Sequence, residues 1–267
     1  RRFWTALAEA QHELGLPPTA PQVAALRKRV DDADLAAVAV WEKKLRHDVM
    51  AHVHHYREQV PEAGGVIHLG ATSCDVTDNA DLVIYRDALD LIGRKLRTTL
   101  RRLSRFALER RETPCVGFTH FQPAQFTTVG KRAALWLQDF VFDHAAWETT
   151  RGALRFRGLR GAVGTQDSFL KLFDGDAAKT LELERRVAKK MGFEASYGVC
   201  GQTYSRKVDA GILELLAGIA QSAHKFAVDV RLLAHENELE EPLEAHQIGS
   251  SAMPYKRNPM RSERICS

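Results

Sequence analysis

The sequence predicts an all-α protein built around long helices. Apolar side chains recur at steps of three or four over residues 78–111 and again over residues 207–238, which places them on one face of a helix. Residues 124–241 contain no proline, so nothing in that stretch forces a helix to break. No segment alternates apolar and polar side chains as a half-buried strand would. Long helices with one apolar stripe bury it against one another, so we expect a helical bundle.

The N-terminal part is more irregular. The segments "LGLPPTAP" at 14–21 and "PEAGG" at 61–65 indicate turns, and helical patches are expected over residues 22–30 and 34–59.

We therefore expect a helical N-terminal domain over residues 1–72 and a long-helix bundle domain over residues 73–267. The chain begins "RRFW" without a methionine and stops inside a helix that starts near residue 260. Both domains are thus expected to be truncated.

Composition excludes several classes of protein. A hydrophobic content of 45% and a charged content of 27% are ordinary for a soluble globular protein. The net charge of +4 permits an anionic ligand but lacks the basic stripe of a nucleic-acid binder. No apolar run is long enough for a membrane span. Four scattered cysteines without paired spacing fit a reducing compartment, so a cytoplasmic location is expected.

Polar segments interrupt the helical pattern, and the first of them is rich in histidine. "LRHDVMAHVHHY" at 45–56 contains four histidines at steps of 5, 2 and 1. Zinc-binding histidine pairs on helices sit four residues apart, so this spacing does not favour a metal site. A solvated or substrate-facing cluster is the preferred interpretation.

Three further segments precede helices, and each allows two interpretations. In "HLGATSCDVTDN" at 68–79 the hydroxyls and carboxylates either cap a helix or help its N-terminus to bind an anion. In "GFTHFQPAQ" at 117–125, His120 precedes Pro123, which we expect to begin the next long helix. "CGQTYSRK" at 200–207 is a further candidate cap or binding segment. Loops at the ends of several bundle helices can converge on one cavity, which favours a binding site.

The segment "GSSAMPYKRNP" at 249–259 is the most unusual one. Asn258 as the N-cap and Pro259 as the first helical residue would start a helix. That interpretation leaves Ser250 and the lysine between the prolines unexplained. A loop with a glycine hinge at Gly249 and stiffening prolines is suited to act as a lid.

These segments together resemble the fumarase/aspartase superfamily. The "AMPYKR" form of the last segment is similar to the adenylosuccinate lyase family, and "LRHDVMAH", "HLGATS", "GFTHFQPAQ" and "GQTYSRK" resemble it in the same order. The resemblance implies the superfamily's long-helix bundle fold and β-elimination of fumarate from adenylosuccinate, giving AMP, and from the succinylated aminoimidazole carboxamide ribotide. It implies no cofactor and no metal.

The resemblance also implies roles for individual residues. His120 matches the general acid, Ser250 the general base, and Glu263 the carboxylate that orients the histidine. Serine is a poor base unless cations and backbone N–H groups stabilise its alkoxide, whereas histidine titrates near neutral pH. The substrate-binding positions implied by the resemblance are Arg46, His47, Asp48, Thr72, Ser73, Gln202, Lys256, Asn258 and Arg264.

Alternatives and partners follow from the same residues. Another fumarate-releasing member, such as argininosuccinate lyase, is disfavoured by the tyrosine in the last segment, and a catalytically silent scaffold is disfavoured because His120 and Ser250 are present. The family's third helical domain and its N-terminal Arg-Tyr contact lie outside this chain. The long apolar stripes predict a homotetramer with active sites shared between subunits. The expected ligand is a small anionic nucleotide, with no nucleic acid and no membrane as partners.

Overall fold

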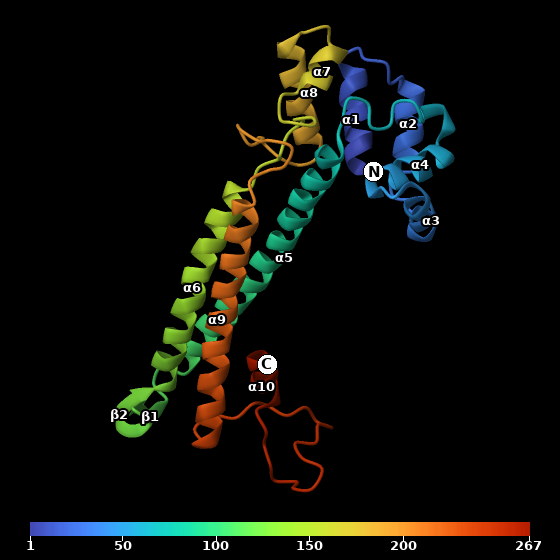
Figure 1. Ribbon diagram of the computed structural model, residues 1–267. Coiled ribbons are helices and arrows are strands. Elements are labelled where there is room, and N and C mark those ends of the chain that lie inside the picture. The colour runs from blue at the N-terminus through green and yellow to red at the C-terminus, as the bar shows by residue number, and fades with distance from the viewer. The chain divides into compact units, whose positions relative to one another are not determined.

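The structure, a computed structural model, describes residues 1–267 and is mostly helical (Figure 1). The chain forms two compact units, and each is assembled from two stretches. Unit 1 holds residues 1–88 and 153–208, and unit 2 holds residues 89–152 and 209–267. The predicted all-α class is confirmed.

Unit 1 gathers short helices around one core. Tyr56 is fully buried, its hydroxyl donates to the Leu26 carbonyl at 2.6 Å, and the Thr5 hydroxyl lies 3.1 Å away. Buried tyrosine hydroxyls require such partners, so these bonds fix three helices to one another. The helices are α1 (Arg2–Glu13), α2 (Ala20–Lys28), α3 (Leu35–Leu45), α4 (Asp48–Gln59), the 3₁₀ turn η1 (Pro61–Ala63), the first part of α5 (Ser73–Glu109), α7 (Asp167–Leu172) and α8 (Ala177–Lys190).

Helix α8 packs against α1, so residues far beyond position 72 complete the unit that begins at residue 1. Lys190 of α8 contributes an ion pair with Glu13 of α1 at 2.7 Å. The two compact units are each assembled from two stretches of the chain, so they are not the two consecutive domains predicted from the sequence. The domain boundary after residue 72 stays a prediction.

The helical patch expected over residues 34–59 is divided into two helices. Asp34 caps α3 by accepting from the N–H groups of Ala36 and Ala37. Arg46 then takes a left-handed conformation, with φ 53°, and ends α3. Because glycine is the usual residue for this conformation, the sequence carries no sign of the break.

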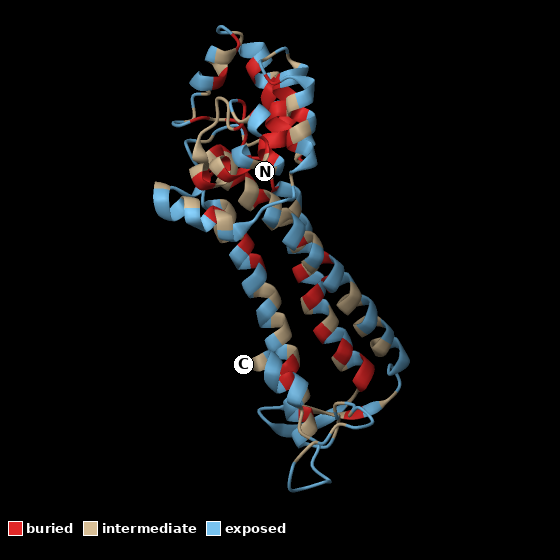
Figure 2. Cartoon of the chain, turned by 90° about the vertical axis from the view of Figure 1, so that its right-hand side faces the viewer, coloured by how far each residue is buried: buried red, intermediate tan, exposed pale blue.

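Unit 2 contains the long helices that the apolar spacing predicts. It holds α6 (Val129–Ala153), the larger parts of α5 and α9 (Lys207–His235), and the short α10 (Met260–Cys266). Buried residues form stripes along the long helices (Figure 2). Trp136 of α6 meets Phe226 of α9 edge-on at 5.1 Å, and Phe106 of α5 packs against the same cluster. The predicted bundle packing is confirmed.

A β-hairpin precedes α6, so the predictions of no strand and of a helix that begins at Pro123 are wrong. Strands β1 (Pro114–Thr119) and β2 (Gln122–Thr128) pair antiparallel, and Pro123 lies opposite Phe118. A proline is tolerated because both strands of a two-stranded sheet are edge strands. Helix α6 therefore begins six residues later than expected, at Val129.

Candidate active site

Arg46, His47 and Asp48 join α3 to α4 at the surface of unit 1. The Nδ1 atom of His47 accepts from the Met50 N–H at 3.4 Å, so the imidazole caps α4. All three side chains line one open depression. An arginine and a histidine beside a helix N-terminus suit an anionic group.

The other histidines of this segment have separate surroundings. His54 stacks on Trp41 with ring centroids 4.7 Å apart, whereas His55 is buried and its Nε2 atom accepts from the Asp34 N–H at 3.2 Å. His55 therefore has a structural role, contrary to the prediction of one solvated or substrate-facing cluster. The sequence could not show this, because the partner of His55 belongs to another helix.

Thr72 and Ser73 lie at the start of α5 in unit 1 and are half-buried. The Thr72 N–H donates to Asp75 Oδ2 at 2.9 Å, and Asp75 follows three residues later, as in a capping box. The capping role predicted for this segment is thus observed for the Asp75 carboxylate at the start of α5. Thr72 and Ser73 are both partly exposed to solvent.

Gln202 lies in a loop of the same unit, shortly before α9. Its side chain is exposed, and its carbonyl accepts from the buried guanidinium of Arg157. Arg157 is also paired with Asp75. The two predicted binding segments at 72–73 and 202 are therefore attached to one buried ion pair. Arg157 could not be found from the sequence, because its partner Asp75 lies 82 residues away and no spacing rule connects them.

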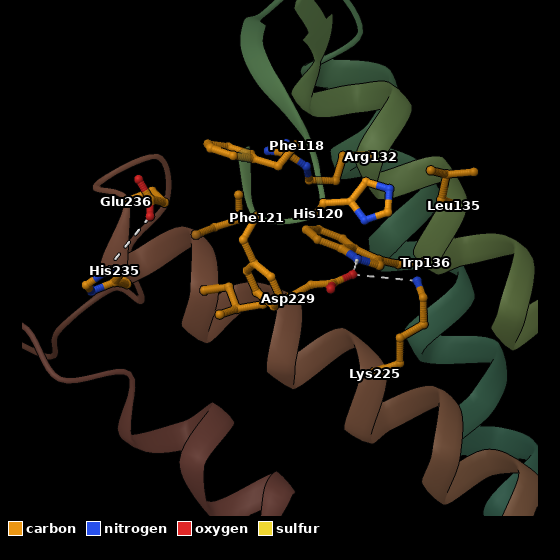
Figure 3. A pocket seen from close by; sticks show the side chains of 12 residues that line it. Phe118, His120, Phe121, Arg132, Leu135, Trp136, Lys225, Asp229, His235 and Glu236 are labelled. Atoms are coloured by element: carbon orange, nitrogen blue, oxygen red, sulfur yellow. Dashed lines mark hydrogen bonds and ion pairs between the residues drawn. The ribbon is translucent and has the colours of Figure 1, made fainter. Parts of the chain in front are cut away.

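His120 lies in the two-residue turn of the hairpin in unit 2. His120 and Phe121 both have positive φ, of 54° and 60°, as a type I′ turn requires. The turn places the imidazole over a cavity between the hairpin, α6 and α9 (Figure 3). Its lining side chains belong to Phe118, His120, Phe121, Arg132, Leu135, Trp136, Lys225, Asp229, Leu232, Leu233, His235 and Glu236.

An aspartate organises the polar side of this cavity. Asp229 Oδ2 accepts from Trp136 Nε1 at 2.7 Å, and Lys225 Nζ lies 3.6 Å from the same oxygen (Figure 3). Aromatic rings, cations and the carboxylates of Asp229 and Glu236 thus surround the space beneath His120. Sequence reasoning did not select Asp229, because its partner Trp136 is 93 residues distant.

Ser250 is half-buried in a loop of unit 2. Its Oγ accepts from the backbone N–H groups of Ala252 at 3.4 Å and Met253 at 3.3 Å. The loop folds back on itself, and a Cβ atom at Gly249 would collide with the Lys256 carbonyl. Gly249 is predicted to serve as a hinge. In the structure, its lack of a side chain permits a close backbone contact.

Glu241 holds the base of this loop. Its carboxylate accepts from the Arg261 N–H at 3.0 Å, the Ser262 N–H at 2.8 Å and the Ser262 hydroxyl at 2.6 Å. Burial alone would raise the pKa of Glu241, but these hydrogen bonds outweigh it and the pKa lies below its usual range. The segment before the loop is therefore fixed to the start of α10.

The end of the loop differs from the prediction. Asn258 was expected to cap the next helix, but its side-chain amide donates to the Gly249 carbonyl at 3.0 Å, and α10 begins at Met260 with Pro259 as its N-cap residue. The amide thereby closes the loop instead. On α10, Glu263 and Arg264 border two different surface depressions of unit 2.

The predicted site residues fall into two groups. His120 shares its cavity with none of the other predicted residues, so a single chain does not gather all of them in one of its described cavities. Their roles stay predictions. Unit 1 contains Arg46, His47, Asp48, Thr72, Ser73 and Gln202, and unit 2 contains His120, Ser250, Lys256, Asn258, Glu263 and Arg264.

The family of the chain follows from its sequence as a whole. The pattern of the Lyase family matches residues 1–267, so the chain belongs to this family. Adenylosuccinate lyase of Saccharomyces cerevisiae is 52% identical over 100% of this chain and 56% of its own length. That of Schizosaccharomyces pombe is 51% identical with the same coverage. The chain thus spans little more than half the length of these relatives, and the resemblance predicted from the motifs is confirmed.

Solved structures agree with this assignment. Fumarate lyase from Mesorhizobium sp. BNC1 is similar with a TM-score of 0.81 and 26% identity, over 99% of this chain and 57% of its own. The 3-carboxy-cis,cis-muconate lactonizing enzyme from Pseudomonas putida has a TM-score of 0.85 and 28% identity, over 99% of this chain and 59% of its own. None of the helices in the structure combines the length and apolar character of a membrane span.

Proposed function

We propose that the full-length protein is a lyase that releases fumarate from adenylosuccinate, giving AMP, and from the succinylated aminoimidazole carboxamide ribotide. The observation that carries this proposal is the 52% identity, across the whole chain, to a protein named adenylosuccinate lyase. The residues of the motifs add to it, since each predicted chemical role is filled by a suitable side chain. The proposed enzyme acts in the cytoplasm, in keeping with four free cysteines.

The substrate is strongly anionic, because it carries a phosphate and two succinyl carboxylates. Arg46 and His47 bind one end of the substrate in the open depression that they line. Lys256 and Arg264 supply positive charge to the succinyl group, where arginine can bind a carboxylate through two nitrogens. Thr72, Ser73, Gln202 and Asn258 contribute uncharged hydrogen bonds that orient the substrate.

Two proton transfers complete the proposed reaction. Ser250 removes the proton beside a carboxylate, and the backbone N–H groups that point at its Oγ support this role because they stabilise negative charge on that oxygen. His120 then gives a proton to the departing nitrogen. Glu263 orients the imidazole by accepting from its other ring nitrogen.

Fumarate release tests this function directly. Full-length protein is incubated with adenylosuccinate, with the succinylated carboxamide ribotide, or with argininosuccinate, and fumarate is followed by its absorbance. We expect turnover of the first two substrates only, and no change after treatment with a chelator. A protein that releases no fumarate from adenylosuccinate refutes the proposed function. Activity that chelation abolishes and metal restores refutes the cofactor-free mechanism.

We further propose that the enzyme is a homotetramer with shared active sites. Large apolar side chains on the long helices of unit 2 stay exposed, with Phe142 at 64% and Leu213 at 65%. Large apolar side chains that are exposed in one chain are of the kind that an interface between subunits buries. Neighbouring subunits would cover these faces, and closed symmetry is the usual outcome. Shared sites would also explain why His120 occupies a cavity without the other predicted residues.

Complementation distinguishes shared sites from sites within one chain. Inactive His120→Ala and Ser250→Ala full-length proteins are mixed under conditions that exchange subunits. We expect part of the activity to return, because some mixed sites receive an intact histidine from one chain and an intact serine from another. Mixing each variant with itself is the control. If exchange is verified by mass and no activity returns, the sites are not shared.

A further inference from the structure

Arg157 is a fully buried arginine outside every predicted site segment. It lies in unit 1, after the end of α6, in the chain segment 154–161. Arginine is almost never fully buried unless it is paired, because removing its charge from water is unfavourable. The partners of Arg157 therefore indicate what it is retained for.

The partner charge is Asp75, which is also fully buried. Besides the guanidinium, Asp75 Oδ1 accepts from the Arg160 N–H at 2.9 Å and the Gly161 N–H at 3.3 Å. Asp75 Oδ2 accepts from the Thr72 N–H at 2.9 Å. One carboxylate thus joins the start of α5 to the segment that carries Arg157.

The guanidinium extends the connection to a third segment. Its Nη2 atom donates to the carbonyl oxygens of Gly161 and Gly201, each at 3.3 Å, and to that of Gln202. The Nη1 atom also donates to the Gly158 carbonyl at 3.5 Å. Four carbonyls and a carboxylate are reached together only because the guanidinium presents several N–H groups in a fixed plane. A lysine would supply a single nitrogen.

Two more buried residues of α5 support the same arrangement. Asn79 Oδ1 accepts from the backbone N–H of Arg157 at 2.8 Å, and Asp78 Oδ2 accepts from the backbone N–H of Tyr204 at 2.9 Å. Asp75, Asp78 and Asn79 lie three and four residues apart, so they occupy one face of the helix. That face holds two non-helical segments, residues 157–161 and residues 201–204, against α5 within unit 1.

We propose that Arg157 is a positioning residue for substrate binding. Together with Asp75 it sets the backbone of Thr72-Ser73 and of Gln202 relative to each other, so that hydroxyls at the start of α5 and the Gln202 amide meet the same substrate. This inference rests on the proposed function, because it assumes that these residues bind the succinylated nucleotide. Arg157 itself is buried and does not touch the substrate.

The test compares two arginine-to-lysine variants of the full-length enzyme. Arg157→Lys keeps the charge beside Asp75 but loses most of the bonds to the carbonyls. Arg86→Lys is the matched control: Arg86 also donates to backbone carbonyls of unit 1, at Met191 and at Gly192 (3.2 Å), away from the predicted site. For Arg157→Lys we expect KM for adenylosuccinate to rise at least about tenfold, the effect of one lost charged hydrogen bond, with kcat within about threefold of wild type. For Arg86→Lys we expect an unchanged KM.

The result that overturns the proposal is a KM in Arg157→Lys equal to that of wild type, or a similar rise in both variants. Should Arg157→Lys not fold, the double variant Asp75→Asn/Arg157→Gln takes its place. It leaves no unpaired buried charge, and the same rise in KM is expected.

Hydrogen exchange separates this inference from the proposed function. In Arg157→Lys the amides of Thr72, Arg160 and Gly161 should lose protection, whereas in Arg86→Lys they should keep it. An inactive wild-type protein would refute the proposed function and the substrate-binding role with it, yet the exchange pattern would still show whether Arg157 holds the segments together. Unchanged exchange in Arg157→Lys refutes the positioning itself.

Discussion

Ser250→Ala and His120→Ala are each expected to lower kcat of the full-length enzyme at least about a hundredfold, the lower range for loss of a proton transfer. His120 is exposed on a hairpin turn and Ser250 is half-buried in a loop, and neither belongs to the helical core, so their removal should leave the fold intact. Steady-state kinetics on adenylosuccinate measure the loss, and circular dichroism checks the helices.

Neighbouring residues of the same type provide the controls. Ser251 follows Ser250 in the same exposed loop, and His246 precedes it. Alanine at either position should leave kcat near the wild-type value. Near-normal turnover in Ser250→Ala or His120→Ala would remove that residue from its assigned role.

The conformation of His120 calls for one more variant. Its φ of 54° is tolerated by asparagine far better than by most residues, including alanine. His120→Asn therefore keeps the turn while it removes the acid, and it should be as inactive as His120→Ala. An active His120→Asn with an inactive His120→Ala would show that turn geometry, and not proton transfer, is what the histidine supplies.

The largest expected effect on stability comes from Asp75→Ala. The change leaves the guanidinium of Arg157 buried without its counter-charge and removes the acceptor for three backbone N–H groups. Breaking a buried ion pair from one side costs about 3–5 kcal/mol. Hydrogen exchange of unit 1 amides under native conditions measures the loss, since a large oligomer need not unfold in two states.

A surface pair supplies the control for this measurement. Asp31 pairs with Arg2 at 3.1 Å, and both side chains are about 70% exposed. Asp31→Ala should change the free energy of unfolding by less than about 1 kcal/mol. A loss in Asp75→Ala no larger than in Asp31→Ala would mean that the buried pair adds little to the stability of unit 1.

The helices were predictable from sequence because their apolar spacing is long and regular, as over residues 78–111. The hairpin at 114–128 was not. Its two-residue turn contains His120 and Phe121 in place of the asparagine and glycine that usually announce a type I′ turn, and Pro123 argues against a strand. The break at Arg46 was hidden for the same reason, since a left-handed residue other than glycine gives no local sign.

The candidate site shows a similar division. Its motifs are contiguous segments such as "GSSAMPYKRNP", so their resemblance to one family can be recognised from the sequence. The residues that hold them are single, distant positions. Asp75 and Arg157 pair across 82 residues, and Trp136 and Asp229 across 93. Such pairs follow from tertiary packing alone, which no periodicity records.

Glu241 has a consequence for how this family can vary. The Glu241 carboxylate accepts hydrogen bonds from Ser262, so residues 242–260 form a loop that is closed at its two ends. These closing hydrogen bonds do not depend on the number of residues in the loop. The entropy of closing a flexible loop grows only logarithmically, by about 0.6 kcal/mol for each doubling. Insertions and deletions between residues 242 and 248 should therefore be well tolerated among relatives. The segment between residues 242 and 248 can therefore differ in length among relatives, while α10 and the close contact of Gly249 with Lys256 stay in place.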